Sequence, residues 1–265
     1  MKKTAVVLTA LVSISGITAG KLYWNEKIES QTSAVSGKAL AETAPAADQP
    51  AANAMGEAEG LTKNLPPAAA KAIVQAEKTG KPAKLVLFGS DTAYGEKDSW
   101  ANQFTEQIKA EYPSGLLEIE TIFIKDKTSK EVIGEKLYSK AAEAKPDLLL
   151  FEPFILEDNG EVGIQNTFDN LSVMIEGIRS QSKDAVIMLQ PSYPLQNAIY
   201  YPKEVEQLQE FADKAGYAFL NHWGNWPAGD SEEMAAYLQE DGNGPSSKGH
   251  SAWAEYLAKV FISKK

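Results

Sequence analysis

The sequence contains no cysteine, only two histidines and a single arginine. The absence of cysteine excludes a disulfide framework, a thiolate nucleophile and a lipoprotein anchor. Any histidine-based mechanism must use either His222 or His250. The 26 basic residues are outnumbered by 36 acidic ones, and the net charge is −10. Nucleic-acid binding needs clustered lysine and arginine to displace counterions, so this balance argues against a nucleic-acid partner.

A long hydrophobic run is also missing from the N-terminus. Residues 4–20 carry no charge, but the run is short for a membrane span and contains several Thr, Ser and Gly. Lys2 and Lys3 precede it, and Tyr23 and Trp24 follow it like interfacial anchors. Residues 1–30 are therefore predicted to be a signal peptide or a retained N-terminal membrane anchor. Both alternatives place the rest of the chain at the extracellular face of a bacterial membrane or in the cell wall, either anchored or secreted.

Residues 31–64 are rich in Ala, Pro, Ser and Glu and contain no aromatic side chain. Such a segment buries too little apolar surface to offset its ordering entropy, so it is predicted to be a flexible linker. The folded domain is then expected over residues 65–265, opening with a short helix after Pro66 and Pro67.

Strand-like and helix-like segments alternate from residue 84 onward. This order predicts a three-layer α/β/α sandwich around a five-stranded, mainly parallel sheet of flavodoxin-like type. The strands are expected at residues 85–88, 116–124, 147–152, 185–190 and 217–220. The helices between and after them are expected at residues 99–112, 129–145, 164–180, 203–215, 231–239 and 247–262.

Three stretches beside these strands carry motifs. The first is residues 89–95 (GSDTAYG), directly after an apolar run; the second is residues 146–159 (PDLLLFEPFILEDN), and the third is residues 241–250 (DGNGPSSKGH). Together they resemble the SGNH (GDSL) hydrolases, in order and spacing, over roughly residues 84–262. The resemblance implies an SGNH-hydrolase-like fold and ester hydrolysis by a serine, a histidine base and an aspartate.

The family roles are carried over to positions that match its motifs. The Asp and Ser of the signature are exchanged, so Asp91 stands where the family keeps its nucleophile. In one arrangement Ser90 takes the nucleophile role, with His250 as its base and Asp241 as the partner of His250. The resemblance assigns an oxyanion or pocket role to Gly89, Glu157 and Asp158.

The chain departs from the family pattern at the positions that carry chemistry. Residues 125–129 lack the expected Gly, Glu157 replaces an Asn, and Gly244 stands at the catalytic His position. Asp91 cannot simply replace a serine, because it would carry a negative charge beside the carbonyl under attack and its acyl product would be an anhydride. The competing interpretation is structural: Ser90 tightens the turn and His250 caps the last helix.

A second group of candidate residues follows the last strand. Residues 221–227 (NHWGNWP) combine two Trp with a His and two Asn, and Tyr193 lies in another loop of the same sheet edge. Aromatic faces beside amides suit sugar rings, so His222, Trp223, Trp226 and Tyr193 are candidate substrate-binding residues. The alternative is that the Trp pair seals the domain and His222 bonds locally.

The sequence favours an SGNH/GDSL-like esterase that cleaves carboxyl esters or O-acyl groups of cell-envelope carbohydrate or lipid. The alternative is a pseudoenzyme, a non-catalytic glycan- or lipid-binding module on the same fold. No cofactor is implied. Glu152, Glu157, Asp158 and Asp91 could gather a divalent cation, but no Asp-x-Asp loop supports such a site, and no metal site is predicted. The expected partner is a small-molecule or glycan ester, with membrane contact through the N-terminal segment only.

Overall fold

The computed structural model describes residues 56–90 and 98–263. The predicted signal or anchor, most of the predicted linker and Asp91 lie outside these described residues. None of the described helices is both long enough and apolar enough to cross a bilayer.

The described residues form a five-stranded sheet in the order β2-β1-β3-β4-β5, with every neighbouring pair parallel. This is the flavodoxin-like order, so the predicted fold class is confirmed. β1 is buried along almost its whole length, as a central parallel strand covered on both faces requires. The strands are β1 (Ala83–Ser90), β2 (Leu117–Ile124), β3 (Leu148–Glu152), β4 (Val186–Leu189) and β5 (Ala218–Phe219).

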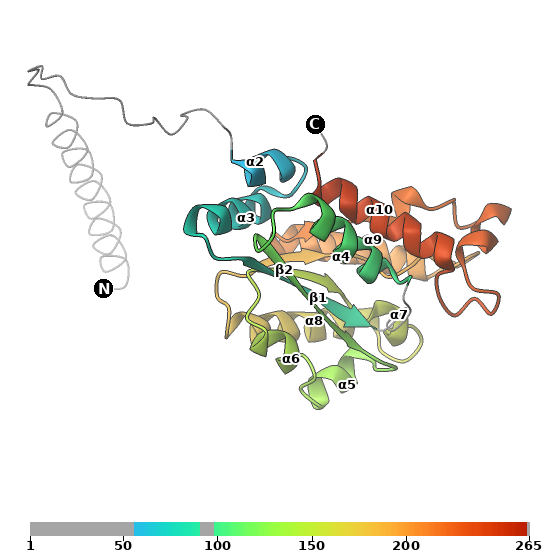
Figure 1. The fold of residues 1–265 in the computed structure, drawn as a ribbon. Helices are drawn as coiled ribbons and strands as arrows, with labels where there is room; N and C mark the ends of the chain where they lie inside the picture. The colour runs from blue at the N-terminus through green and yellow to red at the C-terminus, as the bar shows by residue number, and fades with distance from the viewer. Residues whose placement is uncertain (1–55, 91–97, 264–265) are drawn as a thin grey trace, which may run out of the picture. The chain divides into compact units, whose positions relative to one another are not determined.

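Helices cover both faces of the sheet, and each face has its own apolar core. Figure 1 shows α4 and α10 on one side of the sheet and α5, α6 and α8 on the other. The first layer contains α2 (Glu57–Leu61), α3 (Pro67–Thr79), α4 (Trp100–Glu111), η2 (His222–Asn225), η3 (Glu232–Tyr237) and α10 (Ser247–Phe261). The second contains α5 (Ser129–Gly134), α6 (Ser139–Glu143), α7 (Ile155–Asp158), α8 (Ile164–Arg179) and α9 (Tyr201–Ala215).

The start of α4 follows from its sequence. The Ser99 hydroxyl accepts a hydrogen bond from Asn102 N at 3.3 Å, which caps the helix as predicted. The apolar residues that recur every four positions face the core, and Trp100 stacks on Trp253 of α10 with ring centroids 4.6 Å apart. This stacking fixes the beginning of α4 against the middle of α10.

Three elements differ from their predicted form. The single helix predicted at residues 129–145 is two helices, because Lys136 adopts a left-handed φ of 54° and Leu137 N bonds back to Val132 O in a helix-ending turn. The helix predicted at 231–239 is the short 3-10 helix η3. Its end is followed by Leu238, which pairs with Pro245 in an isolated bridge.

The third difference is the start of the folded body, which lies before residue 65. Residues 57–61 form α2, and Ala58 has no exposed surface. Ser263 N donates to Leu61 O at 2.8 Å, so the end of the chain holds this segment. Residues 56–64 therefore belong to the domain and not to the linker.

Candidate functional site

The carboxyl ends of the parallel strands bring polar side chains from distant parts of the chain together. β1 ends at Ser90 and β3 ends at Glu152, and Gly89 is in register with Glu152. Ser192 follows β4, and His222 follows β5. Ligands bind at this edge of open α/β sheets, so this is where the site is sought.

Ser90 is hydrogen-bonded to Glu152 through both its backbone and its side chain. Ser90 N donates to Glu152 Oε2 at 2.8 Å, and Ser90 Oγ donates to the same oxygen at 2.7 Å. Ser90 is 3 % exposed and Glu152 1 %. A Cβ on Gly89 would lie 2.4 Å from Glu152 O, so only glycine permits this approach of β1 to β3.

The environment of Glu152 favours its neutral form. Burial raises its pKa well above the usual value, the negative charge of Glu157 raises it further, and hydrogen bonds from Ser90 and the Ser192 side chain offset part of the rise. Among the residues that the structure describes, Oε1 of Glu152 has no hydrogen-bond partner. Glu152 is therefore a buried carboxyl group whose Oε2 accepts both hydrogen bonds from Ser90.

Two tyrosines lie near these acidic groups. Burial, with the charges of Glu157, Glu152 and Asp241, raises the pKa of Tyr193 to about 12. Burial and the charges of Glu152 and Glu157 also raise the pKa of Tyr201. Both phenols are consequently neutral at physiological pH, and both rings are buried. Ser90, Glu152, Glu157, Tyr193 and Tyr201 are referred to below as the acid–tyrosine cluster.

Glu157 and Asp158 lie side by side on α7 but face different surroundings. Asp158 accepts hydrogen bonds from Ser129 N at 2.7 Å, Ser129 Oγ at 2.5 Å and Thr167 Oγ1 at 2.6 Å. It is 2 % exposed and ties α5, α7 and α8 together. Glu157 therefore acts on the cluster through its charge, whereas Asp158 has a structural role and joins three helices.

His250 lies inside α10 and is fully buried; the cap of this helix is Ser246. Trp100 N donates to His250 Nδ1 at 3.3 Å. Burial lowers the pKa of His250 to about 4, while the charge of Asp98 opposes this shift. Because Nδ1 accepts a hydrogen bond, the neutral ring carries its proton on Nε2. A triad histidine needs the opposite tautomer, with Nε2 free to accept the serine proton.

Asp241, the predicted partner of His250, lies in the exposed loop before α10. Its carboxylate accepts hydrogen bonds from Asn243 N at 3.0 Å and Asn243 Nδ2 at 3.2 Å. These bonds close the local turn. Ser90, His250 and Asp241 thus have separate hydrogen-bond partners in the described part of the chain, and the proton of Ser90 Oγ points to Glu152.

His222 and the two tryptophans beside it form a packed network. His222 Nδ1 accepts from Trp226 Nε1 at 3.0 Å, and His222 Nε2 donates to Pro191 O at 3.0 Å. The His222 ring stacks on Trp253 at 4.0 Å, and burial lowers its pKa to about 3. His222 has no exposed surface, so in this arrangement it supports the loop instead of contacting a ligand. Trp223 is partly exposed, and its Nε1 donates to Ser192 O at 2.7 Å.

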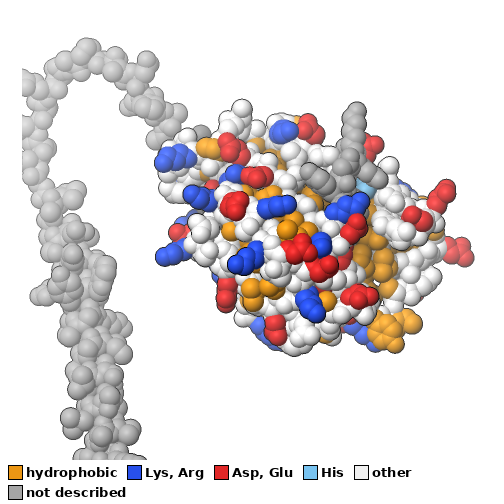
Figure 2. All heavy atoms as spheres, turned by 90° about the horizontal axis from the view of Figure 1, so that it is seen from below, with side chains coloured by type: hydrophobic (Ala, Val, Ile, Leu, Met, Phe, Trp, Pro, Cys, Tyr) orange, Lys and Arg blue, Asp and Glu red, His pale blue; other side chains and the backbone are white. Residues whose placement is uncertain are grey.

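No group of three or more His, Cys, Asp or Glu side chains is placed to hold a metal ion within residues 56–90 and 98–263. Lys and acidic side chains are interspersed over the face of the domain seen in Figure 2.

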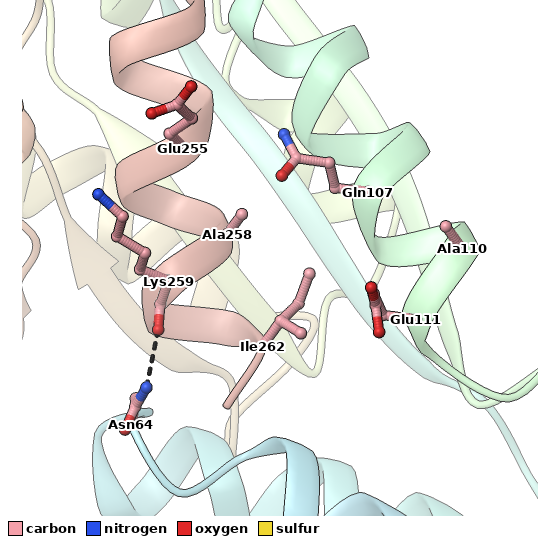
Figure 3. Close-up of a pocket in the computed structure, with 8 residues that line it drawn as sticks. All are labelled: Asn64, Gln107, Ala110, Glu111, Glu255, Ala258, Lys259 and Ile262. Atoms are coloured by element: carbon pink, nitrogen blue, oxygen red, sulfur yellow. Dashed lines mark hydrogen bonds between the residues drawn. The ribbon is translucent and has the colours of Figure 1, made fainter. Parts of the chain in front are cut away.

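A separate pocket of about 640 Å³ lies between α4, α10 and the loop before α3 (Figure 3). Asn64 Nδ2 donates to Lys259 O at 2.9 Å across one side of it. It lies where α4 and α10 end, whereas Ser90 lies at the end of the sheet where these helices begin. Its lining gathers no nucleophile and base, so it is not the candidate catalytic site.

Sequence reasoning placed Gly89 and Ser90 at this edge but gave Glu152 no role beside Ser90. The signal was present as an acidic residue between Phe151 and Pro153, at the end of an apolar run. A carboxylate in such a run is costly to bury unless it is hydrogen-bonded or has a function. Tyr201 was expected at this sheet edge, but its neighbours were not, because a tyrosine at a helix start gives no sign of the residues that it faces.

No protein-family profile and no curated protein sequence matches this chain. Solved structures do match. A lipolytic protein of the G-D-S-L family from Desulfitobacterium hafniense is 18 % identical with a TM-score of 0.55, covering 67 % of this chain and 99 % of its own. A carbohydrate esterase family 3 structure from Talaromyces cellulolyticus is 13 % identical with a TM-score of 0.56, covering 67 % and 95 %. An acetyl-xylooligosaccharide esterase from Geobacillus is 14 % identical with a TM-score of 0.56, covering 70 % and 98 %.

These likenesses confirm the predicted resemblance at the level of the fold. The chain has the three-layer fold of GDSL-type lipases and esterases.

Proposed function

We propose that this domain hydrolyses acyl esters, with Ser90 as nucleophile and Glu152 as the group that accepts its proton. The observation that carries the proposal is the 2.7 Å hydrogen bond from Ser90 Oγ to Glu152 Oε2. It lies at the end of β1, on a fold shared with lipases and esterases. A nucleophilic hydroxyl needs an adjacent base within hydrogen-bond reach, and Glu152 meets this requirement where His250 does not.

The reaction balances with these two residues. Ser90 Oγ forms a bond to the acyl carbon while its proton passes to Glu152, and the alcohol leaves with that proton as its C–O bond breaks. Water then attacks the acyl-serine, Glu152 takes the water proton and returns it to Ser90 Oγ, and the carboxylic acid is released. Glu152 must be ionised to begin this cycle, so its raised pKa predicts turnover that increases with pH.

For the substrate we infer acylated carbohydrate of the bacterial cell envelope. Two neighbours of the same fold are described as a carbohydrate esterase and an acetyl-xylooligosaccharide esterase. The predicted export of the chain would bring this domain to cell-surface polymers. An acetyl group is small and suits a nucleophile as enclosed as Ser90.

One observation favours the second candidate, a non-catalytic module that binds glycan or lipid. Both histidines are neutral and hydrogen-bonded inside the domain, and Ser90 is 3 % exposed. In that case the bond between Ser90 and Glu152 serves only to hold β1 against β3.

Hydrolysis of p-nitrophenyl acetate by the full chain separates these alternatives. Ser90→Ala should lower kcat/KM about 10³-fold or more, and Glu152→Gln, which keeps the shape of the side chain, by about 10²-fold or more. His250→Gln should leave turnover per folded molecule within about threefold, because His250 does not receive the serine proton. Ser180→Ala is the matched control, since Ser180 Oγ bonds only its own helix end.

Undiminished turnover in Ser90→Ala would overturn the proposal. Loss in His250→Gln with retention in Glu152→Gln would assign the base to His250. A wild-type chain that binds saccharide but hydrolyses no ester between pH 5 and 9 would support the non-catalytic module.

A further inference from the structure

Beside the acid–tyrosine cluster lies a second pocket of about 570 Å³, within the range of about 300–1,000 Å³ typical of small-molecule sites. We propose that this pocket binds an uncharged sugar ring, and so holds the carbohydrate part of the ester. Only the link to ester cleavage rests on the proposed function; the binding itself does not. The Trp223–Trp226 pocket is lined chiefly by Pro194, Leu195, Asn197, Trp223, Trp226 and Asp230.

The walls of the Trp223–Trp226 pocket come from two loops that are tied together. Asn197 N donates to Gly229 O at 2.9 Å, and Gln196 Nε2 donates to Ser231 O at 3.2 Å. Asn197 holds a left-handed φ of 56°, which turns the first loop toward the second. The pocket is therefore preformed, and a ligand does not have to order its walls.

Hydrogen bonds from their N–H groups fix the two indole rings, and these bonds point away from the pocket. Trp223 Nε1 donates to Ser192 O, and Trp226 Nε1 donates to His222 Nδ1. A Cβ on Gly249 would lie 2.8 Å from the Trp226 ring, so α10 presses directly on this indole. Since both N–H groups are satisfied, the rings present apolar carbon surface to the pocket. Such surface packs against the C–H groups of a pyranose.

The polar groups of the pocket select against other ligands. Among the described residues that line it, Asp230 is the one charged residue, and it is exposed. A carboxylate and the Asn197 amide accept and donate hydrogen bonds to sugar hydroxyls, but offer nothing to an acyl chain. The described lining residues include no cation and the net charge of the chain is −10, so anionic polymers are disfavoured.

Trp223 connects this pocket to the acid–tyrosine cluster. The Trp223 ring lies 5.5 Å from the Tyr201 ring, and Tyr201 is close enough to Glu152 for the carboxylate to raise its pKa. One layer of side chains thus separates the two sites. The residues between lining positions Ala198 and Pro202 include Ile199 and Tyr200, which are 67 % and 73 % exposed. Their side chains do not line the pocket, but they are exposed on the same loop, where we expect them to contact a second ring of a longer saccharide.

The test is binding of saccharides that contain no ester, measured by calorimetry with the full chain. The probes are xylotriose and the trimer of N-acetylglucosamine, with octanoate and a glucuronic acid oligomer as the lipid-like and anionic alternatives. Binding of either neutral trimer is expected. Trp223→Ala should weaken it about tenfold or more, and Asp230→Asn, which keeps the side-chain shape, several-fold.

Two variants keep the outcome interpretable. Tyr200→Ala removes an exposed ring that does not support the fold, and should weaken trimer binding. Val173→Ala, an exposed position on α8, should not. Ser90→Ala should bind as the wild type does, so a failed esterase assay does not decide this proposal. Absence of binding to both neutral trimers, or tighter binding of octanoate or the anionic oligomer, would overturn it.

Discussion

At the scale of single residues, the buried histidines are sources of pH-dependent stability. His222 has an ordinary pKa of 6.5 when unfolded, and burial lowers the value to about 3 in the fold. Between these two pH values the unfolded chain binds a proton that the folded chain excludes. The contribution of His222 is complete above pH 6.5 and is lost as pH falls toward 3.

We therefore expect the free energy of unfolding to depend on pH through His222. Its contribution should rise by about 1.4 kcal/mol per pH unit across this window. Glu152 acts in the opposite direction, because its raised pKa favours the protonated fold and its contribution is lost as pH rises. Urea unfolding at pH 4, 5 and 6 of the wild type and His222→Gln isolates the histidine. The variant should show a shallower rise; equal slopes in the two proteins would contradict the assignment.

Single residues also show which features of the site could be predicted from the sequence and which could not. Gly89 and Ser90 were expected at the carboxyl edge, because an apolar run followed by Gly marks a strand end, and they lie there. The hydrogen-bond partner of Ser90 was not foreseen, since Glu152 stands 62 positions away and meets it only through the pairing of β1 with β3. The tautomer of His250 likewise depends on Trp100 N, a contact between α4 and α10 that no local pattern encodes.

At the scale of elements, the close approach of β1 and β3 is what forms the site. Gly89 has no room for a side chain because the Glu152 carbonyl and carboxyl lie against it. Gly60 in α2 is the reverse case, with open space around its Cα. Packing therefore requires glycine at position 89. At position 60 nothing in the packing requires it, and glycine only weakens the helix.

Gly89→Ala should lower the free energy of unfolding by about 2–4 kcal/mol, because the new methyl group must displace Glu152. Gly60→Ala should raise it by up to about 1 kcal/mol, since alanine is the better helix former. Thermal and urea unfolding of both variants measures the difference. A Gly89→Ala variant as stable as the wild type would mean that β1 and β3 are not packed this tightly.

Periodicity predicted the elements whose apolar face is continuous, including α4, α8 and α10. It failed between residues 129 and 145, where the break follows from the left-handed Lys136 and not from hydrophobic pattern. It also gave no sign of the bonds from Ser129 and Thr167 to Asp158, which hold α5 and α8 to α7. Such contacts join residues whose local sequence is ordinary.

At the scale of the whole molecule, composition misplaced the beginning of the domain. Residues 56–64 share the small and acidic residues of the segment before them, yet they pack on the ends of α3 and α10. Ala58 N donates to Glu77 Oε1 at 3.0 Å, and Thr62 is 2 % exposed. A short helix of this kind is stabilised by tertiary contacts and not by its own propensity, so composition alone does not reveal it.

Truncation tests this boundary. A chain that begins at residue 56 should have the same free energy of unfolding as the full chain. A chain that begins at residue 65 should lose about 2–5 kcal/mol of its free energy of unfolding, because it lacks the buried Ala58 and the hydrogen bonds from Ser263 N to Leu61 O and from Asn64 to Lys259 O.

Point variants of the intact chain test the same boundary. Ala58→Asp should be comparably destabilising, while Glu59→Ala at the neighbouring exposed position should change the free energy of unfolding by less than about 0.5 kcal/mol. Equal stability of the two truncated chains would show that residues 56–64 belong to the linker and not to the domain.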